Sequence, residues 1–247
     1  MTPPRPAAAR RAAAPALVVF CREPVPGQVK TRLQARLGAS AAAALAHSFI
    51  LDALERARRV GDGRLVIAAG CCGDARRSRY FLRLARGFGA LLIDQGGGGL
   101  GARMARALAP FAAEGAVLMG TDTPSLPPAL LERSLSLIAQ VETVVAPSLD
   151  GGYYLIGVRR QLPDIFSGIG WGRARVLAQT VARLKQLGVS YAMGPAWYDI
   201  DRWSDLALLV AHLRMLGASQ PNPAKLEVPC QHTLATLKRL GLMGQAR

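Results

Sequence analysis

Two aspartates follow apolar runs in this sequence, at spacings that would let their carboxylates do chemistry together. Asp122 comes after the run 116–119, and Asp150 comes after the run 143–146. If both runs are strands of one mostly parallel sheet, the carboxylates lie at its carboxyl edge, where open α/β sheets bind ligands. Carboxylate oxygens suit Mg²⁺ or Mn²⁺, and such a metal can bridge to phosphate oxygens. The pattern points to chemistry on a nucleotide or a nucleotide-sugar.

A loop that contains prolines and a glycine, residues 22–30, follows the first predicted strand at 16–21. Lys30 and Arg32 at its end can neutralise phosphates, and amides at the start of the next helix would add donors. The segment matches neither a Walker A loop nor a GxGxxG motif. The alternative is that Lys30 and Arg32 are two solvated surface charges. The position of the loop after the first strand makes phosphate binding about as well supported as that alternative.

Four consecutive glycines, 96–99, precede a helix predicted over 100–114. A flexible turn is the simplest interpretation. Because such a run is costly to order, a loop that closes over a ligand is the functional alternative. Gly99 would then approach a base or ribose, and Arg103 would face phosphate or substrate.

The dipeptide Asp150-Gly151 is a strong turn signal. A turn after a strand would also present the carboxylate, so both interpretations can hold together. Gly151 and Gly152 would leave room for a sugar, with Tyr153 beside it. Trp171, in a predicted loop, is a candidate for stacking on a sugar or acceptor, and core packing is equally compatible with its position.

Asp199 and Asp201 straddle one residue, so their side chains point the same way if the segment is extended. Two like charges that close are unfavourable unless a cation lies between them. Asp201 is therefore a candidate metal ligand, although one of the pair is expected to cap the following helix. Ser125 is the corresponding candidate cap for a helix that begins at 127–128.

Strands and helices alternate through the first 140 residues. Strands are expected at 16–21, 64–69, 90–94 and 116–119, with helices between them, and later at 153–158 and 189–193. Further helices are expected at 173–187, 204–216 and 234–242. This order predicts an α/β fold with a mostly parallel central sheet covered by helices on both faces.

The composition excludes several classes of protein. A hydrophobic fraction of 51% excludes general disorder, and proline, glycine or arginine interrupts every apolar run before it reaches the length of a membrane span. The net charge of +15 indicates either a solvated arginine-rich surface or a field that attracts polyanionic small molecules. Nucleic acid is a weaker candidate, because no basic stretch carries interleaved aromatic residues.

The chain is expected to form one catalytic domain over 16–217. Residues 1–15 are predicted to be a flexible tail without the apolar core of a secretory signal, and residues 218–247 a linker and a C-terminal helix. The four cysteines lack metal-ligand spacing. They favour a reduced, cytoplasmic protein.

The order and spacing of several motifs resemble one bacterial family. The motifs are KTRL at 30–33, LGARM at 100–104, GTDTPSLPPALLE at 120–132, DGGYYLIG at 150–157, the region around Trp171, and YDID at 198–201. The family consists of glycosyltransferase-like proteins with the Rossmann-like GT-A (nucleotide-diphospho-sugar transferase) fold. Some members are associated with radical-SAM genes and assigned to arsenosugar biosynthesis. The resemblance covers about residues 16–210.

The resemblance implies a GT-A fold and a nucleotide-diphospho-sugar as donor. It implies that Asp122 and Asp201 bind a metal, that Lys30 and Arg32 contact phosphates, and that residues 150–153 face the sugar or acceptor. One departure matters: many metal-dependent glycosyltransferases carry Asp-x-Asp, whereas this chain offers one carboxylate after its central strand. Nucleotidyltransferases, including phospholactate guanylyltransferase, therefore compete, since some share this fold and a similar basic first loop.

We therefore expect an enzyme that transfers a sugar from a nucleotide-diphospho-sugar to a small acceptor, assisted by Mg²⁺ or Mn²⁺ held by Asp122 and Asp201. The cation with Lys30 or Arg32 would stabilise the leaving nucleotide, and Asp150 would act as general base or hold sugar hydroxyls. The alternative is nucleotidyl transfer from an NTP to a phosphorylated small molecule with release of pyrophosphate. A nucleotide-binding module without turnover is the third hypothesis. Partners are expected to be small molecules, with no nucleic acid.

Overall fold

The computed structural model of the chain describes residues 14–218 and 229–244. The predicted N-terminal tail and most of the predicted linker therefore lie outside the described residues. The division into segments 1–15, 16–217 and 218–247 stays a prediction.

A seven-stranded sheet forms the centre of the molecule, in the order β3-β2-β1-β4-β6-β5-β7. The strands are β1 (Ala16–Arg22), β2 (Leu65–Gly70), β3 (Leu91–Asp94), β4 (Ala116–Met119), β5 (Thr143–Pro147), β6 (Tyr153–Val158) and β7 (Tyr191–Met193). β1 pairs in parallel with β2 and β4, whereas β6 runs antiparallel between β4 and β5. The predicted α/β fold with a mostly parallel sheet is confirmed.

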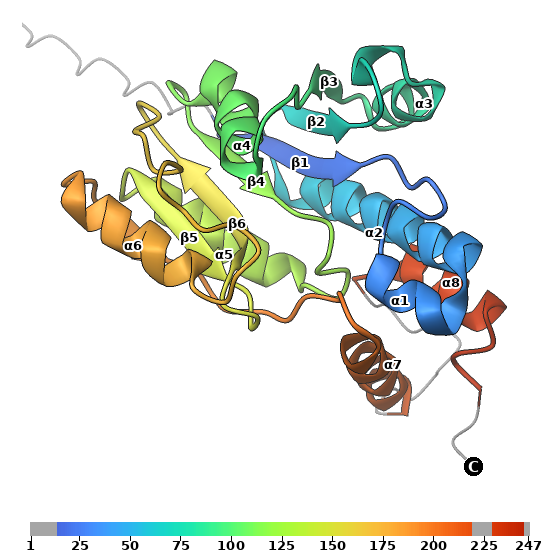
Figure 1. The fold of residues 1–247 in the computed structure, drawn as a ribbon. Helices are drawn as coiled ribbons and strands as arrows, with labels where there is room; N and C mark the ends of the chain where they lie inside the picture. The colour runs from blue at the N-terminus through green and yellow to red at the C-terminus, as the bar shows by residue number, and fades with distance from the viewer. Residues whose placement is uncertain (1–13, 219–228, 245–247) are drawn as a thin grey trace, which may run out of the picture.

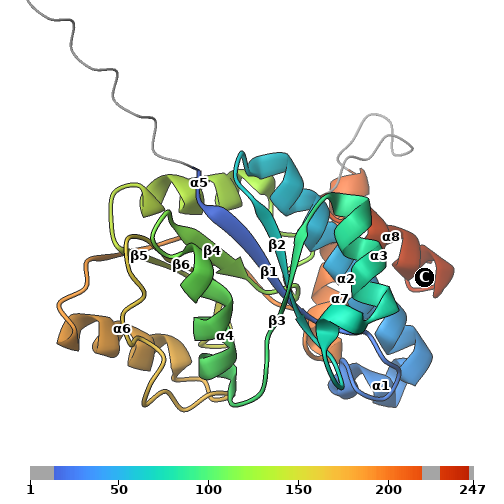
Figure 2. The ribbon, with the colours of Figure 1, turned by 90° about the horizontal axis from the view of Figure 1, so that it is seen from above.

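The central strands are continuous apolar runs because helices cover both of their faces. Leu17 and Val19 of β1 belong to one core cluster, and Val18 between them belongs to the other. The alternation of side chains along a strand thus divides one short run between two cores. The first core is shared with α2, α3 and α5, and the second with α4 and α6. Figure 2 shows α4 and α6 on the opposite side of the sheet from α5.

The helices are α1 (Thr31–Leu37), α2 (Ala39–Val60), α3 (Arg79–Phe88), α4 (Leu100–Leu108), α5 (Pro128–Ile138), α6 (Val176–Gln186), α7 (Trp203–Ala218) and α8 (Gln231–Arg239), with short 3₁₀ helices η1 (Ala75–Arg77) and η2 (Ala109–Phe111). A third apolar cluster joins α1, α2, α7 and α8, which lie together at one end of the molecule in Figure 1. Among the residues described, no helix combines the length and the apolarity needed to cross a membrane.

Local capping sets where several helices begin. Ser40 lies inside α2, whose N-cap is Gly38 with a φ of 78°. Asp74 caps only η1, through the amide of Arg76, and Ser78 caps α3 through the amide of Phe81. Two capping residues four positions apart therefore begin two separate helices, η1 and α3.

Candidate functional site

Two cavities open at the carboxyl edge of the parallel strands. One, of about 440 Å³, includes Lys30, Asp122, Tyr153 and Asp201 in its wall, and we call it the Asp122 cavity. The other, of about 900 Å³ beyond β2 and β3, includes Asp94, and we call it the Asp94 cavity. Three residues line both: Arg22, Gln95 and Arg103. The cavities therefore meet at a boundary that carries two guanidinium groups.

Lys30 is placed by an unusual backbone conformation at the start of α1. Its φ of 48° and ψ of 41° are left-handed, and it is the N-cap of that helix. The side chain is 7% exposed, and its Nζ lies 2.7 Å from Oδ1 of Asp122. The same ammonium donates to the carbonyl of Ile200 at 2.5 Å and lies 5.5 Å from the centre of the Phe49 ring. The loop after β1 thus delivers a nearly buried cation to the predicted acid.

The segment that carries Asp122 is joined to the late segment that carries the other acids. The backbone carbonyl of Asp122 accepts from the amide of Ile200 at 2.8 Å. Ser125 donates from Oγ to the hydroxyl of Tyr198 at 2.8 Å and accepts from Nε1 of Trp197 at 3.2 Å. Ser125 therefore links the two segments instead of capping α5, which was the role predicted for it; the N-cap is Pro127.

Asp201 lines the Asp122 cavity and forms an ion pair with Arg32. The predicted capping role belongs to another residue. Oδ2 of Asp205 accepts from the amides of Asp201 and Arg202 at 3.0 and 2.6 Å, in front of α7. The carboxylate of Asp201 thus stays available to the site.

Asp199 is an acid whose pKa responds to the charges of two other carboxylates of the site. Burial is the largest cause that raises the pKa of its carboxyl to about 6; the charges of Asp150 and Asp122 act in the same direction, and Lys30 opposes them. Asp201 is paired with Arg32, whereas the charges that act on Asp199 are those of Asp150, Asp122 and Lys30. Sequence reasoning noted the spacing of Asp199 and Asp201 but assigned the metal role to Asp201 alone.

Asp150 lies in the turn between β5 and β6. Its Oδ1 accepts from the amide of Gly152 at 2.8 Å and from Oγ of Ser148. Gly151 has a φ of 89°, and a Cβ there would lie 2.1 Å from the carbonyl oxygen of Ala174, so this turn requires glycine. Asp150 acts on Asp199 electrostatically but lines neither cavity.

Tyr153 and Trp171 occupy different positions. Tyr153 lines the Asp122 cavity, and burial raises the pKa of its hydroxyl. Trp171 lines neither cavity. It packs against the backbone of Gly101 in the first turn of α4 and meets the ring of Tyr153 edge-on at 6.4 Å. Gly99, the last of the four glycines, is the exposed N-cap of α4.

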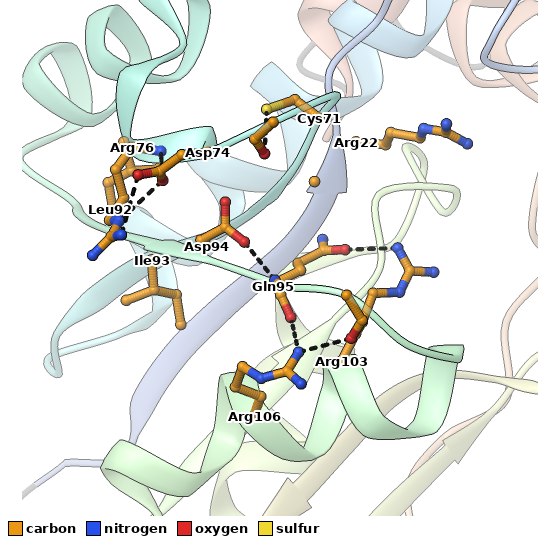
Figure 3. A pocket seen from close by; sticks show the side chains of 14 residues that line it. Arg22, Cys71, Asp74, Arg76, Leu92, Ile93, Asp94, Gln95, Arg103 and Arg106 are labelled. Atoms are coloured by element: carbon orange, nitrogen blue, oxygen red, sulfur yellow. Dashed lines mark hydrogen bonds and ion pairs between the residues drawn. The ribbon is translucent and has the colours of Figure 1, made fainter.

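The boundary between the cavities is organised by Gln95, a buried residue that follows β3. Its Nε2 donates to the carbonyls of Cys21 and Ala68, at 3.0 and 2.9 Å, and its Oε1 accepts from Arg103 at 3.1 Å. Figure 3 shows Gln95 and Arg103 directed toward each other, with Arg106 reaching the backbone carbonyl of Gln95. The buried Gln95 amide therefore sets the position of the Arg103 guanidinium.

Two guanidinium groups at this boundary keep unused donors. The Nε of Arg103 is buried without a hydrogen-bond partner. Arg22 is exposed, and its side chain makes no hydrogen bond or ion pair with the part of the chain that the structure describes. Arg22 and Gln95 were not predicted as site residues; for Arg22, the signal was a charge placed directly after an apolar strand. The exposed guanidinium of Arg22 is suited to phosphate oxygens.

The acids do not form a ready metal site. Within residues 14–218 and 229–244, no group of three or more histidine, cysteine, aspartate or glutamate side chains is arranged to hold a metal ion. Asp122 and Asp201 are each paired with a cationic side chain of the protein.

Comparison with known proteins agrees with this geometry. Residues 53–173 match a family model described as "Uncharacterized protein conserved in bacteria (DUF2064)". The structure is similar to that of a protein from Desulfovibrio desulfuricans G20 assigned to the nucleotide-diphospho-sugar transferases, with a TM-score of 0.77 and 29% identity over 94% of this chain and 96% of that one. No curated protein matches the chain.

More distant structures share the fold alone. A cytidylyltransferase from Leptospira borgpetersenii serovar Hardjo-bovis has a TM-score of 0.54 at 12% identity, over 95% of this chain and 99% of that one. CMP:2-keto-3-deoxy-manno-octonic acid synthetase, complexed with CTP, has a TM-score of 0.52 at 14% identity, over 81% and 99%. The chain thus has the fold of the nucleotide-diphospho-sugar transferases, as the motifs predicted. These comparisons do not support the association with radical-SAM genes or arsenosugars.

Proposed function

We propose that this protein is a transferase that binds a nucleotide-diphospho-sugar across the two cavities and transfers the sugar to a small acceptor. The observation that carries the proposal is the boundary where Arg22 and Arg103 lie between two cavities of different character. A diphosphate is the part of such a donor that joins a nucleoside to a sugar. Its charge would be matched by guanidinium groups at that boundary.

The Asp94 cavity is the better place for the nucleoside. Its volume of about 900 Å³ falls in the range of pockets that hold small molecules. Leu92 and Ile93 supply apolar surface for a base, and the carboxylates of Asp74 and Asp94 supply acceptors for hydroxyl groups. Gly96 and Gly97 line this cavity, and the glycine loop 96–99 would approach the nucleoside.

The Asp122 cavity would hold the sugar and the reacting atoms. The acceptor oxygen forms a bond to the anomeric carbon as the bond from that carbon to the phosphate oxygen breaks. The acceptor proton passes to a base, and the nucleoside diphosphate leaves with the electron pair. Lys30, Arg22 and Arg103 would stabilise the negative charge that develops on the leaving phosphate.

Two carboxylates are candidates for the base. Asp150 keeps the role predicted for it, either as the base or as a ligand for sugar hydroxyls. Neither Asp150 nor Asp199 lines the Asp122 cavity, so either would have to meet an acceptor that extends beyond the wall of that cavity. Asp199 is the second candidate, because burial raises its pKa to about 6, close to the pH at which a general base works best. The turn of Gly151 and Gly152 would border the acceptor.

We also propose that a divalent metal fits this site only together with the phosphates. The ammonium group of Lys30 contacts both Oδ1 of Asp122 and the carbonyl oxygen of Ile200, so these two oxygens already bind a positive charge. Phosphates that draw Lys30 and Arg32 away would release the carboxylates of Asp122 and Asp201 to hold Mg²⁺ or Mn²⁺. A metal bound there would neutralise charge on the diphosphate.

Nucleotidyl transfer from an NTP to a phosphorylated small molecule is the second candidate. The same arginine-lined boundary would bind a triphosphate, and a shared fold does not decide the reaction. The greater similarity to the Desulfovibrio desulfuricans protein favours the sugar donor.

Products separate the two reactions. Wild-type protein is incubated with a panel of UDP-, GDP-, CDP- and ADP-sugars, and separately with each NTP plus sugar phosphates, in the presence of Mn²⁺. Release of a nucleoside diphosphate from a nucleotide-sugar supports the proposal, and release of pyrophosphate from an NTP supports the second candidate. Binding of a nucleotide without either product would favour a binding module. An Arg86→Ala variant, changed on the exposed surface of α3, is the matched control.

A further inference from the structure

The C-terminal helix α8 is attached to α2 by a buried carboxylate. Asp52 of α2 is 1% exposed. Its oxygens accept from the amides of His232 and Thr233, both at 2.9 Å, and from the hydroxyl of Thr233 at 2.5 Å. Cys230, the N-cap of α8, provides no side-chain hydrogen bond. Asp52 therefore performs the capping that the sequence of α8 does not supply.

One turn further along α2, a buried guanidinium reaches the loop that carries Asp122. Arg56 is 2% exposed and donates from one terminal nitrogen to the carbonyl of Pro124, while its Nε has no partner. Pro124 lies two residues after Asp122, between β4 and α5. α2 thus carries two buried charges, one bound to α8 and one bound to the Asp122 loop.

Asp52 and Arg56 are four residues apart on α2, so their side chains lie on the same face of that helix. A buried charge is costly unless it is paired or hydrogen-bonded. Burial lowers the pKa of Arg56 to about 10, and the negative charge of Asp52 opposes that change, so the guanidinium stays protonated at neutral pH. Burial raises the pKa of Asp52, and its bonds to Thr233 and His232 oppose that change. Without α8, Asp52 would lose these bonds and become a weaker partner for Arg56.

We infer that α8 positions the Asp122 loop through Asp52 and Arg56, which act as positioning residues and not as catalytic ones. The link runs from the amino end of α8 to Asp52, then to Arg56 and the carbonyl of Pro124. The loop is also joined at Asp122 to Ile200, so its position affects both acidic segments. This inference rests on the proposed function in one respect, because that function is what gives the Asp122 loop its role in ligand binding. Residues 229–244 lie outside the segment that matches the family model.

Amide hydrogen exchange of the full chain tests the link without a substrate. Arg56→Met removes the donor to Pro124 with little change in volume, and Arg56→Lys keeps a cationic donor. Thr233→Val removes one of the bonds to Asp52. Thr236→Val makes the same chemical change at a buried threonine one turn further along α8, away from Asp52, and is the matched control.

We expect exchange of amides 120–126 to accelerate at least about tenfold in Arg56→Met, because a hydrogen bond from a charged group is lost. Thr233→Val should accelerate the same amides by a smaller factor, Arg56→Lys should restore most of the protection, and Thr236→Val should leave it unchanged. If Arg56→Met does not fold, Thr233→Val decides the question.

Acceleration confined to α8 in Thr233→Val, or equal acceleration of the loop and of β1 in Arg56→Met, would overturn the inference. If the exchange pattern holds but no nucleotide binds to the wild-type protein, the proposed function fails while the link stands.

Discussion

At the scale of single residues, the acidic side chains of the site form ion pairs with its basic side chains. Lys30 is nearly buried and its charge is matched by Asp122, and Arg32 is matched by Asp201. A phosphate that enters must compete with these carboxylates for the two cations. Any metal must in turn compete with the cations for the carboxylates. The two ligands should therefore assist each other, and coupling of this kind is reciprocal between them.

Asp122→Ala tests this exchange directly. Binding of a nucleoside diphosphate to the wild-type protein should strengthen when Mn²⁺ is added, whereas the variant should show no dependence on Mn²⁺ and an unchanged circular dichroism spectrum. Titration calorimetry with and without Mn²⁺ measures both effects. Asp62→Ala, a change at an exposed loop acid, is the control. Equal enhancement by Mn²⁺ in the wild type and in Asp122→Ala would remove the metal role of Asp122.

Asp199 predicts a pH dependence of stability. Its pKa is about 6 in the folded chain, against about 3.9 for an unfolded aspartate. Between these values the folded state binds more protons, so the contribution of Asp199 to stability falls as pH rises and stays unfavourable above about pH 6. Asp199→Asn should therefore raise the melting temperature near pH 8, with a smaller effect near pH 4, in metal-free buffer.

Asp62→Asn, at an exposed acid, should show no such difference between the two pH values. A melting temperature of Asp199→Asn below that of the wild type near pH 8 would show that the ionised carboxylate is stabilised in the fold, contrary to its environment.

At the scale of elements, the sequence predicted the strands better than the contacts between loops. Apolar runs predicted the central strands closely, because burial on both faces requires them to be apolar throughout. Sequence motifs also predicted that Asp122 and Lys30 lie in one site. The bond between Lys30 and the Ile200 carbonyl joins residues 170 positions apart, and no local pattern encodes it. The left-handed backbone of Lys30 has no local signal either, because a residue other than glycine seldom adopts a positive φ.

The first turn of α4 has a close contact that a glycine permits. A Cβ on Gly101 would lie 2.9 Å from two atoms of Trp171 and 3.1 Å from Cβ of Phe166. Gly101→Ala should therefore lower the free energy of unfolding by about 1–3 kcal/mol, because the aromatic ring must shift. Chemical denaturation measures the change.

Gly87→Ala is the matched control for that substitution. Gly87 lies in α3, where a Cβ would meet nothing within 4 Å, so alanine should stabilise the protein by about 0.5–1 kcal/mol. If Gly101→Ala gave the same stabilisation as Gly87→Ala, Trp171 would not be fixed against α4, and its predicted role as a stacking surface for a sugar or acceptor would gain support.

At the scale of the whole molecule, the topology brings separate loops to one edge of the sheet. The parallel order β3-β2-β1-β4 places the carboxyl ends of these strands at one edge of the sheet, and Arg22, Gln95 and Asp122, which follow β1, β3 and β4, share the wall of one cavity. This convergence was predictable from alternating strands and helices. The division into two cavities was not, because it depends on the buried amide of Gln95 and on the side chain of Arg103. The excess of 31 basic over 16 acidic residues adds a positive field around the site.

The central claim is that the boundary between the two cavities binds a diphosphate, and titration calorimetry tests it most directly. Wild-type protein, Arg22→Ala and the control Arg86→Ala are titrated with UDP, GDP, CDP and ADP at low and at high salt. The account predicts that at least one nucleoside diphosphate binds to the wild type and to Arg86→Ala, and that binding weakens about tenfold or more in Arg22→Ala with a smaller dependence on salt. Equal affinity in Arg22→Ala and the wild type, or no binding of any of the four, would contradict it.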